Sequence, residues 1–274
     1  MILLQYFQAI RSVLFKFGDY RPHKIGLALF FQWINQFPKE DRSVILKLFN
    51  SVIYVNEKDT RDALVMLNTD LLNFVFKESD LTYNNIIYAT FSTPASSSHV
   101  MLNMLRDAAN LERTKATILD LKGTGELYRK TSELGEGIII YVDDFIGSGK
   151  QFSKNRNFAS EFIVGNFGEY LLAPVICEEA LPKLNDLGVQ PVYAHLHTID
   201  ERPLHKDNNY LNENEKHKLI SICRSINKNQ GLGFKKMAAM VVFYRNSPNN
   251  MPLVLRGSLG QAPYKGILPR ANDF

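Results

Sequence analysis

The apolar positions in the first 80 residues follow a helical period. Hydrophobic side chains recur every three or four residues, which is the spacing of one face of a helix. The spacing predicts helices over residues 1–20, 22–37, 38–52 and 57–76. We therefore expect a helical N-terminal region over residues 1–80.

The first of these helices has a candidate contact face. At helical spacing the face consists of Leu3, Phe7, Ile10, Val13, Leu14 and Phe17. Polar residues interrupt the segment and no small-residue cleavage site follows it, so we expect neither a membrane span nor a signal peptide. We expect the face to pack on the protein itself or on a partner protein.

After residue 80 the period changes, and short apolar runs alternate with helical segments. Such alternation predicts an α/β fold with a mainly parallel sheet covered by helices. We expect this second domain to occupy residues 81–274. The predicted strands are 85–91, 117–121, 138–142, 171–177, 191–196 and 240–244, and the predicted helices begin near 100 or cover 155–165, 179–187 and 215–227.

Composition narrows the class of ligand. The chain has 274 residues, 45% of them hydrophobic, which is enough for a sizeable core. The net charge of +4 suits a phosphorylated small molecule, and no block of basic and aromatic residues indicates nucleic acid as a direct ligand. Cys177 and Cys223 form no CxxC unit, so we expect no cysteine metal site and a reducing, cytoplasmic location.

The predicted strand 138–142 leads into the part of the chain that is richest in chemistry. Two adjacent carboxylates follow the strand, and a turn of small residues comes two positions later. Carboxylates accept hydrogen bonds from sugar hydroxyls, and a glycine-rich turn lets backbone N–H groups surround a phosphate. The carboxylates are Asp143 and Asp144, and the turn and its continuation are Gly147, Ser148, Gly149, Lys150 and Gln151.

Two other interpretations of this stretch are weaker. A Walker loop would need a glycine at Asp144 and a Ser or Thr at Gln151, so ATPase chemistry is not indicated. A purely structural acidic turn would gain little from two adjacent carboxylates, because they repel each other. The order of strand, acid pair and glycine turn favours a binding site for a phosphorylated sugar.

The stretch Ile139–Gln151 resembles the signature of type I phosphoribosyltransferases. The resemblance implies that Asp143 and Asp144 bind the ribose hydroxyls of phosphoribosyl pyrophosphate, with Mg²⁺ accompanying the pyrophosphate. It also implies that the loop binds the 5-phosphate through Gly147, Ser148, Gly149, Lys150 and Gln151. The chain departs from the signature at Gln151, where a Ser or Thr hydroxyl is usual.

Three further segments extend the resemblance over most of the chain. Together with the acidic stretch 143–151, the segments Trp33–Phe37, Ser92–Ser98 and Asn246–Pro252 resemble, in their order, the phosphoribosyltransferase-like proteins of bacterial conflict systems. This resemblance implies a role in antiphage defence, in some members beside a retron reverse transcriptase. It does not imply a particular reaction.

The serine-rich segment has two interpretations. By the resemblance, its hydroxyls and N–H groups bind pyrophosphate, through Ser96, Ser97 and Ser98. Alternatively, Ser96 or Ser97 caps the following helix and needs no ligand. His99 is a candidate proton carrier, although a structural role is commoner for a single histidine near a helix start.

Two more segments leave alternatives open. Residues 113–130 carry cations and glycines where the family has a mobile loop that closes over pyrophosphate, but a solvated linker fits equally well. Asn249 and Asn250 lie between two prolines, which favours a structural corner over a place in the acceptor pocket.

The sequence supports two hypotheses for the function. The first is an enzyme of the glycosyltransferase class that uses phosphoribosyl pyrophosphate or a related ribose phosphate, acting on nucleotides as an effector. The second is a non-catalytic sensor of a phosphoribosyl or nucleotide ligand, with the N-terminal helices contacting a protein partner. A third possibility, nucleic-acid binding, would require strongly salt-dependent affinity.

Overall fold

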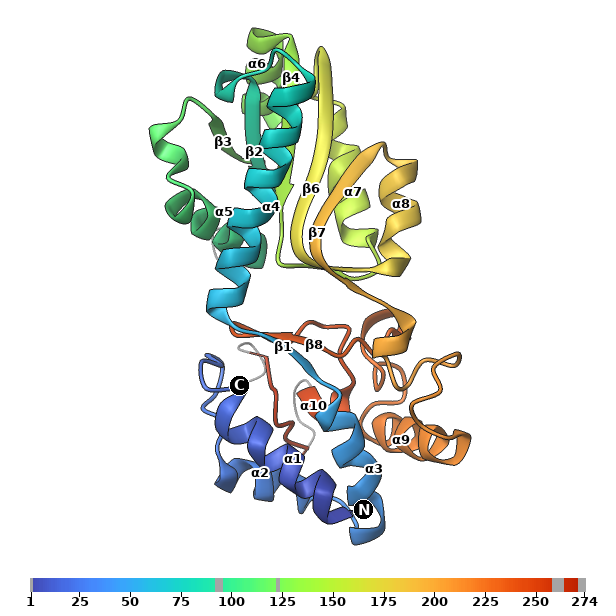
Figure 1. The fold of residues 1–274 in the computed structure, drawn as a ribbon. Coiled ribbons are helices and arrows are strands. Elements are labelled where there is room, and N and C mark those ends of the chain that lie inside the picture. Colours follow the sequence, from blue (N-terminus) through green and yellow to red (C-terminus); the bar gives the residue numbers. More distant parts are fainter. Residues whose placement is uncertain (1, 92–95, 122–123, 258–263, 271–274) are drawn as a thin grey trace. The chain divides into compact units, whose positions relative to one another are not determined.

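The structure of the chain is a computed structural model that describes residues 2–91, 96–121, 124–257 and 264–270. It divides into two compact units (Figure 1). Lys58–Leu196 form one unit, called here the sheet unit. Met1–Glu57 and His197–Phe274 form the other, called the helical unit.

The sheet unit contains a six-stranded sheet. Five of its strands are predicted from the sequence, and the sixth predicted strand, 240–244, lies in the helical unit instead. The pairs β2–β3, β2–β4, β4–β6 and β5–β6 are all parallel, which confirms an α/β fold with a mainly parallel sheet. The strands follow the order β3 (Thr117–Asp120), β2 (Ile86–Thr90), β4 (Glu136–Val142), β6 (Asn166–Cys177) and β5 (Phe145–Ile146), and β7 (Val189–His197) also pairs with β6.

Helices cover both faces of this sheet. Side chains of a strand alternate between its faces, so Ile138 and Ile140 of β4 face one layer while Ile139 and Tyr141 face the other. All four are buried, as in a central parallel strand. The first layer contains α4 (Glu57–Glu78) and α5 (Ser97–Ala108), and the second contains α6 (Thr124–Leu134), α7 (Lys150–Ser160) and α8 (Leu181–Asp186).

The helical unit assembles both ends of the chain around an aromatic core. Phe30, Trp33 and Phe49 contact one another there, and the indole N–H of Trp33 donates to the carbonyl of Val254 at 3.0 Å. Strands β1 (Ile53–Val55) and β8 (Val241–Phe243) pair in parallel. The helices are α1 (Ile2–Phe15), α2 (Leu27–Ile34), α3 (Lys39–Asn50), α9 (Glu213–Ile226) and α10 (Leu253–Arg256).

Short 3₁₀ turns join several of these elements. They are η1 (Tyr83–Asn85), η2 (Leu111–Arg113), η3 (Glu178–Ala180), η4 (Ile199–Glu201) and η5 (Phe234–Lys236). No helix in the described ranges is both long enough and apolar enough to cross a membrane.

The first helix forms as predicted, and only the C-terminal part of its predicted contact face, Val13 and Phe17, is buried in the protein. Val13 is 2% exposed and buries with Gln5 and Ala9, whereas Leu3 is 81% exposed and Phe7 is also exposed. The buried residues Gln5, Ala9 and Val13 therefore lie on a different side of the helix from Leu3 and Phe7. Gln5 is buried because its amide oxygen accepts a hydrogen bond from Ser43 at 2.8 Å, so a polar partner on α3 outweighs the apolar pattern.

The compact units differ from the predicted division at residue 80. Residues 58–80 belong with the sheet, because Leu64, Leu71 and Leu72 of α4 contact the core of its first layer. Residues 197–274 belong with the N-terminal helices, because Val242 and Val254 join the core around Trp33. Contacts between distant segments decide this grouping, and local sequence patterns do not report them.

Three features of the structure differ from the sequence-based expectations. The helix expected over 155–165 is α7, which begins at Lys150, so Lys150 and Gln151 lie in its first turn. Residues 124–130 of the segment expected to be a mobile loop or linker belong to helix α6. The sequence pattern does not predict strand β1, because its three residues carry no alternation of their own.

The start of β4 gives a test of the fold. A methyl group at Gly137 would overlap the backbone oxygen of Asn85. We expect Gly137→Ala to lower the free energy of unfolding by about 1–3 kcal/mol, as overpacking does. Gly125→Ala is the matched control, because it meets no described atom within 4 Å in helix α6, and we expect it to stabilise by about 0.5–1 kcal/mol. Urea denaturation of both variants is the measurement, and equal stabilities would contradict the β2–β4 packing described above.

Candidate functional site

The acidic pair lies where the sheet's pairing is interrupted. Strand β6 pairs first with β4, ending at Val142 opposite Leu172, and then with β5, resuming at Phe145 opposite Val175. The register is unchanged across the gap, so Asp143 and Asp144 lie beside Ala173 and Pro174. Pro174 has no N–H to donate to the ladder. The two carboxylates are therefore held at the carboxyl end of β4 by pairing on both sides of them.

Hydrogen bonds fix the first of the two carboxylates. The N–H of Asp143 donates to the carbonyl of Leu172 at 3.1 Å, and Oδ1 of Asp143 accepts the N–H of Asp144 at 2.9 Å. Burial raises the pKa of Asp143 well above its usual range, and the neighbouring Asp144 raises it further through its charge and a side-chain hydrogen bond. The Asp144 N–H and a hydrogen bond from Ser97 act against this rise. The pair therefore holds a proton more readily than two exposed aspartates do.

The glycine turn ends on a helix N-terminus. Gly149 has φ +68°, a conformation that favours glycine, and it is the residue before α7. The first N–H groups of an 11-residue helix have no partner within the helix and carry partial positive charge. Lys150 and Gln151 are exposed in this first turn. The turn can therefore accept an anion, with the lysine charge beside it.

Lys183 is a cation at the turn that sequence reasoning missed. Its Nζ donates to the carbonyl of Ser148 at 2.5 Å. Lys183 belongs to α8, more than thirty residues along the chain. Nothing in the local sequence marks it, because only tertiary packing brings α8 next to the turn.

A partly buried ion pair anchors α7 on the sheet. Arg156 of α7 pairs with Glu169 of β6, and the hydroxyl of Tyr141 on β4 donates to the same carboxylate at 2.7 Å. Burial raises the pKa of Tyr141, with the Glu169 charge as the next cause, so its hydroxyl remains a donor. This contact joins three elements and fixes the direction from which the start of α7 approaches the acid pair.

The structure brings the serine segment to the acid pair. Ser97 hydrogen-bonds Asp143, so the start of α5 and the end of β4 meet at one edge of the sheet. Ser96 is the N-cap of α5 and accepts the N–H of His99 at 3.4 Å. Ser98 is buried and its Oγ lies 2.9 Å from Oγ1 of Thr90. The capping interpretation of Ser96 is therefore confirmed, and pyrophosphate binding by the three serines stays a prediction.

Asp120 is a second group that the sequence did not reveal. It ends β3 opposite Thr90, at the same edge as the acid pair, and its Oδ2 lies 4.0 Å from Nδ1 of His99. Among the described residues, neither Nδ1 of His99 nor Oδ1 of Asp120 has a hydrogen-bond partner, although both atoms are buried. The carboxyl ends of adjacent parallel strands converge, which is the signal that would have placed Asp120 here.

Parts of two predicted loops lie outside the described residues. These are residues 92–95 of the serine segment and residues 122–123 of the expected mobile loop. In the described part of the latter, Arg129 forms an ion pair with Glu133 in α6, and Lys130 lies 3.3 Å from the same carboxylate. These cations are therefore engaged along their own helix.

The asparagine run forms a structural corner of the helical unit. Asn250 is buried, and the carbonyl of Asn249 accepts the N–H of Phe234 at 2.8 Å and a hydrogen bond from Arg256. The corner interpretation is thus supported by contacts of both asparagines within that unit.

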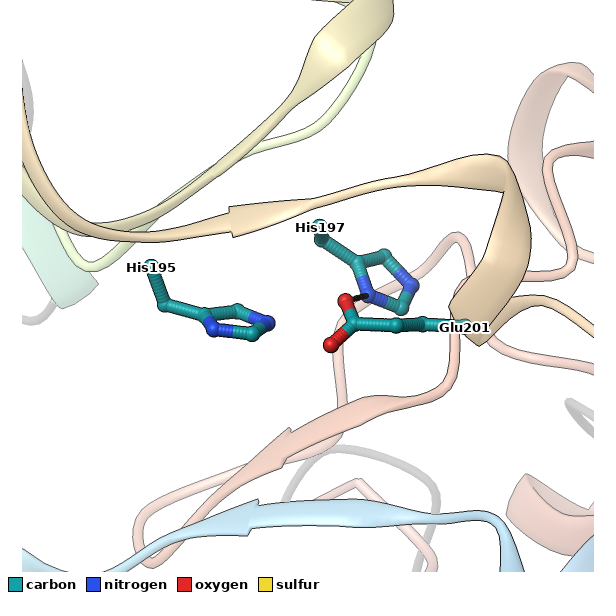
Figure 2. Close-up of side chains that lie close together, drawn as sticks. All are labelled: His195, His197 and Glu201. Atoms are coloured by element: carbon teal, nitrogen blue, oxygen red, sulfur yellow. Dashed lines mark hydrogen bonds and ion pairs between the residues drawn. The ribbon is translucent and has the colours of Figure 1, made fainter.

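A local group of metal-ligand types lies at the end of β7 (Figure 2). His195, His197 and Glu201 offer ligand atoms within 4.8 Å of one another. Met240 N–H donates to Nε2 of His197 at 3.1 Å, so this nitrogen carries the lone pair and Nδ1 carries the proton. Nδ1 then donates to Glu201 at 2.8 Å. A histidine bonded in this way has no lone pair for a metal ion, so His197 is a structural residue.

A mainly parallel α/β sheet, with an acid pair and a glycine turn at the carboxyl edge, is the arrangement expected of a phosphoribosyltransferase-like protein. The sequence profile of the PRTase-CE family matches residues 31–270. The chain therefore belongs to the PRTase-CE family.

Solved structures give partial similarities. Hypoxanthine-guanine phosphoribosyltransferase from Schistosoma mansoni in complex with IMP is 14% identical over 54% of this chain and 69% of that chain, with a TM-score of 0.37. Orotate phosphoribosyltransferase from Aeropyrum pernix is 16% identical over 50% and 68%, with a TM-score of 0.31. The AQ2163 protein from Aquifex aeolicus is 8% identical over 63% and 86%, with a TM-score of 0.35. With TM-scores below 0.5, none of the three supports a conclusion about this chain. No curated protein matches it.

The raised pKa of Asp143 predicts a pH-dependent effect of Asp143→Asn. The folded chain holds a proton on Asp143 more tightly than the unfolded chain, so stability falls as pH rises from the unfolded value, about 3.9, through the folded one. We expect the substitution to raise the melting temperature near pH 8. The gain should vanish near pH 4. Thermal melts from pH 4 to 8 measure it, and a gain that is constant across this range would contradict the assignment.

The hydrogen bonds of His197 predict that zinc does not stabilise the chain. A ligand that binds only the folded state raises the melting temperature. We expect thermal melts with micromolar Zn²⁺ and with a chelator to agree. A rise with Zn²⁺ that His195→Ala abolishes would contradict the tautomer assigned here.

Proposed function

We propose that the chain binds phosphoribosyl pyrophosphate, or a related ribose phosphate, at the carboxyl edge of its sheet. The observation that carries this proposal is the fixed succession of acid pair, glycine turn and helix N-terminus. Asp143 and Asp144 are held by pairing with β6 on both sides, and α7 begins immediately after Gly149. A ribose phosphate needs carboxylates for its hydroxyls and backbone N–H groups for its phosphate, a short distance apart.

Each group has a role in this proposal. The carboxylates of Asp143 and Asp144 accept hydrogen bonds from the ribose hydroxyls. The 5-phosphate lies against the N–H groups at residues 147–151, where the start of α7 favours negative charge. Lys150 and Lys183 add positive charge, and the amide of Gln151 donates where a hydroxyl is usual.

Mg²⁺ is part of the proposal, accompanying the pyrophosphate group. Magnesium prefers oxygen ligands, and it usually keeps several waters beside one or two carboxylates and the substrate's phosphates. Asp120 fits this preference, because its Oδ1 is buried at the same edge without a hydrogen-bond partner among the described residues. When bound, the ion would offset the charge of the leaving pyrophosphate.

The reaction class that fits is glycosyl transfer. The bond between C1 of the ribose and the pyrophosphate oxygen breaks, the electron pair leaves with pyrophosphate, and a nucleophile of the acceptor forms the new bond to C1. Positive charge grows on the sugar as the bond breaks, and the adjacent carboxylates stabilise it. Membership of the PRTase-CE family supports this class.

A sensor without catalysis is the second candidate. The hydroxyls of Ser96 and Ser98 are engaged in hydrogen bonds within the protein, and Ser97 is bonded to Asp143. A pyrophosphate loop whose hydroxyls are occupied favours a pocket that holds a ligand without transferring it. Gln151, which stands where a Ser or Thr hydroxyl is usual, also favours the sensor.

The proposed setting is a nucleotide-directed role in bacterial antiphage defence, beside a protein partner. The exposed apolar side chains of α1 support the partner, because Leu3, Leu4 and Phe7 form an apolar surface that is unusual on an isolated chain. A plaque assay comparing the intact chain with Asp143→Ala/Asp144→Ala tests the setting. Equal protection by both chains would sink a role for the pocket in defence.

Binding of phosphoribosyl pyrophosphate is the direct test of the pocket. We expect micromolar affinity with Mg²⁺ by titration calorimetry, and a loss of at least about tenfold in Asp143→Ala/Asp144→Ala, because even one charge-assisted hydrogen bond is worth about 1.5–3 kcal/mol. The matched control is Asp70→Ala/Glu161→Ala, which removes the same charge from exposed positions of the sheet unit.

Two outcomes separate the hypotheses. Equal affinity in both double variants would overturn the proposed site. Binding that depends on the acid pair, without release of pyrophosphate in the presence of any base, favours the sensor over the transferase.

A further inference from the structure

The helical unit contains an open surface pocket of about 610 Å³, called here the cavity, that the proposed function does not use. It is lined by α1, the end of α3, the segment around β1 and the loop before α9. All of its lining residues belong to the helical unit, whereas the acid pair belongs to the sheet unit. Its volume is in the range of pockets that hold small molecules.

One face of α1 forms a wall of this cavity. Gln8, Arg11, Ser12 and Phe15 all line it, and their spacing of three and four residues places them on one side of the helix. This face is neither the buried stripe of Ala9 nor the apolar stripe predicted from the sequence. It combines a cation, polar groups and one aromatic ring.

The cavity carries positive charge that is not neutralised. Arg11 and Lys16 both line it, and neither forms an ion pair with a carboxylate of the described residues. The ammonium of Lys16 donates to the carbonyl of Val52, a neutral acceptor. Burial lowers the pKa of Lys16, which shows the cost of holding this charge without an anion. A negatively charged group in the cavity would recover that cost.

Exposed aromatic rings also line the cavity. Phe15 is 79% exposed and Tyr210 is 56% exposed, although both belong to its lining. The segment carrying Tyr210 is held in place, because Asn208 donates to the carbonyls of Ile199 and Asp200, at 2.9 Å each, and accepts the N–H of Tyr210 at 2.8 Å. Because the backbone that carries Tyr210 is held, stacking on a flat ligand requires ordering of the ring alone.

Tyr54 completes the lining with a fixed ring. Its hydroxyl donates to Asp19 at 2.7 Å, so the edge of the ring is held while the ring itself lines the cavity. The cavity thus combines two cations with three aromatic side chains. A nucleotide suits this combination, since bases stack on aromatic rings and phosphates pair with cations.

We propose that this cavity is a second ligand site, which binds a nucleoside monophosphate or a similar small molecule that joins a flat aromatic ring to an anionic group. Arg11 and Lys16 take the phosphate, and Phe15 and Tyr210 take the base. The proposal is independent of phosphoribosyl binding at the sheet. The size of the cavity favours a single nucleotide over a nucleic-acid strand.

The test is titration calorimetry with adenosine 5′-monophosphate and no Mg²⁺. It is carried out on the intact chain and on Asp143→Ala/Asp144→Ala, so that binding at the sheet unit is recognised. We expect Arg11→Gln to weaken binding at least tenfold and Phe15→Ala about fivefold or more, in both backgrounds. The matched controls are Arg224→Gln on α9 and Phe7→Ala on α1, which are exposed and do not line the cavity, and which should bind as the intact chain does.

The groups of the ligand are tested separately. Adenosine, which lacks the phosphate, and ribose 5-phosphate, which lacks the base, should each bind at least tenfold more weakly than the nucleotide in the chain with the double alanine substitution. Phosphoribosyl pyrophosphate binding should be unchanged in Arg11→Gln, so failure of one site is distinguished from failure of the other.

Three results would overturn the proposal. The first is affinity weaker than millimolar in the intact chain. The second is equal loss in Arg11→Gln and Arg224→Gln, or loss that follows only the Asp143 and Asp144 substitutions. The third is tighter binding of a single-stranded oligonucleotide with a steep salt dependence, which would assign the cavity to a nucleic-acid strand.

Discussion

Strand β6 is the constraint on which the candidate site depends. It pairs with β4 and then with β5 in one register, and between the two stretches Pro174 offers no N–H to the ladder. Only Asp143 and Asp144 fall between the two paired stretches, and the N–H of Asp143 still donates to Leu172 of β6. A carboxylate pair in a free loop would move apart under its own repulsion. Here the strand on either side holds the two groups together.

The same strand also orients the helix that comes after the acid pair. Glu169 of β6 holds Arg156 of α7, and the hydroxyl of Tyr141 joins them from β4. The direction of α7 determines where its first N–H groups point, and so where an anion binds. The serine segment reaches the site from a third strand, through Ser97. Acid pair, anion site and serine segment are therefore supported by the sheet rather than by loops, which is how precise sites are built.

The two units differ in how they bury apolar side chains. In the sheet unit, continuous apolar strands are covered on both faces, and polar chemistry is confined to the strand ends. In the helical unit, the two ends of the chain meet around Trp33, and α1 keeps most of its apolar side chains exposed. A helix that buries Gln5 and exposes Leu3 has a surface adapted to something besides its own core. The proposed partner surface and the second cavity both lie on this helix.

Much of the fold could be predicted from the sequence, because its strands are apolar enough to be read locally. The run Ile138–Val142 has to be buried, and alternation of such runs with helical segments specifies a parallel sheet. The acid pair and the glycine turn could be found in the same way, since their chemistry depends on neighbouring residues. The N-cap at Ser96 also follows from local hydrogen bonding.

Only the tertiary structure decided the rest, because the deciding contacts join distant residues. Lys183 and Asp120 reach the site through packing and strand order, which leave no mark on the residues beside them. Gln5 of α1 is buried because its amide oxygen accepts a hydrogen bond from Ser43, a residue of α3. The sequence by itself determined the chemistry of the acid pair, since the two carboxylates and their turn are consecutive. The tertiary structure determined which charges surround that chemistry, since electrostatic and hydrogen-bond partners are selected by distance in space.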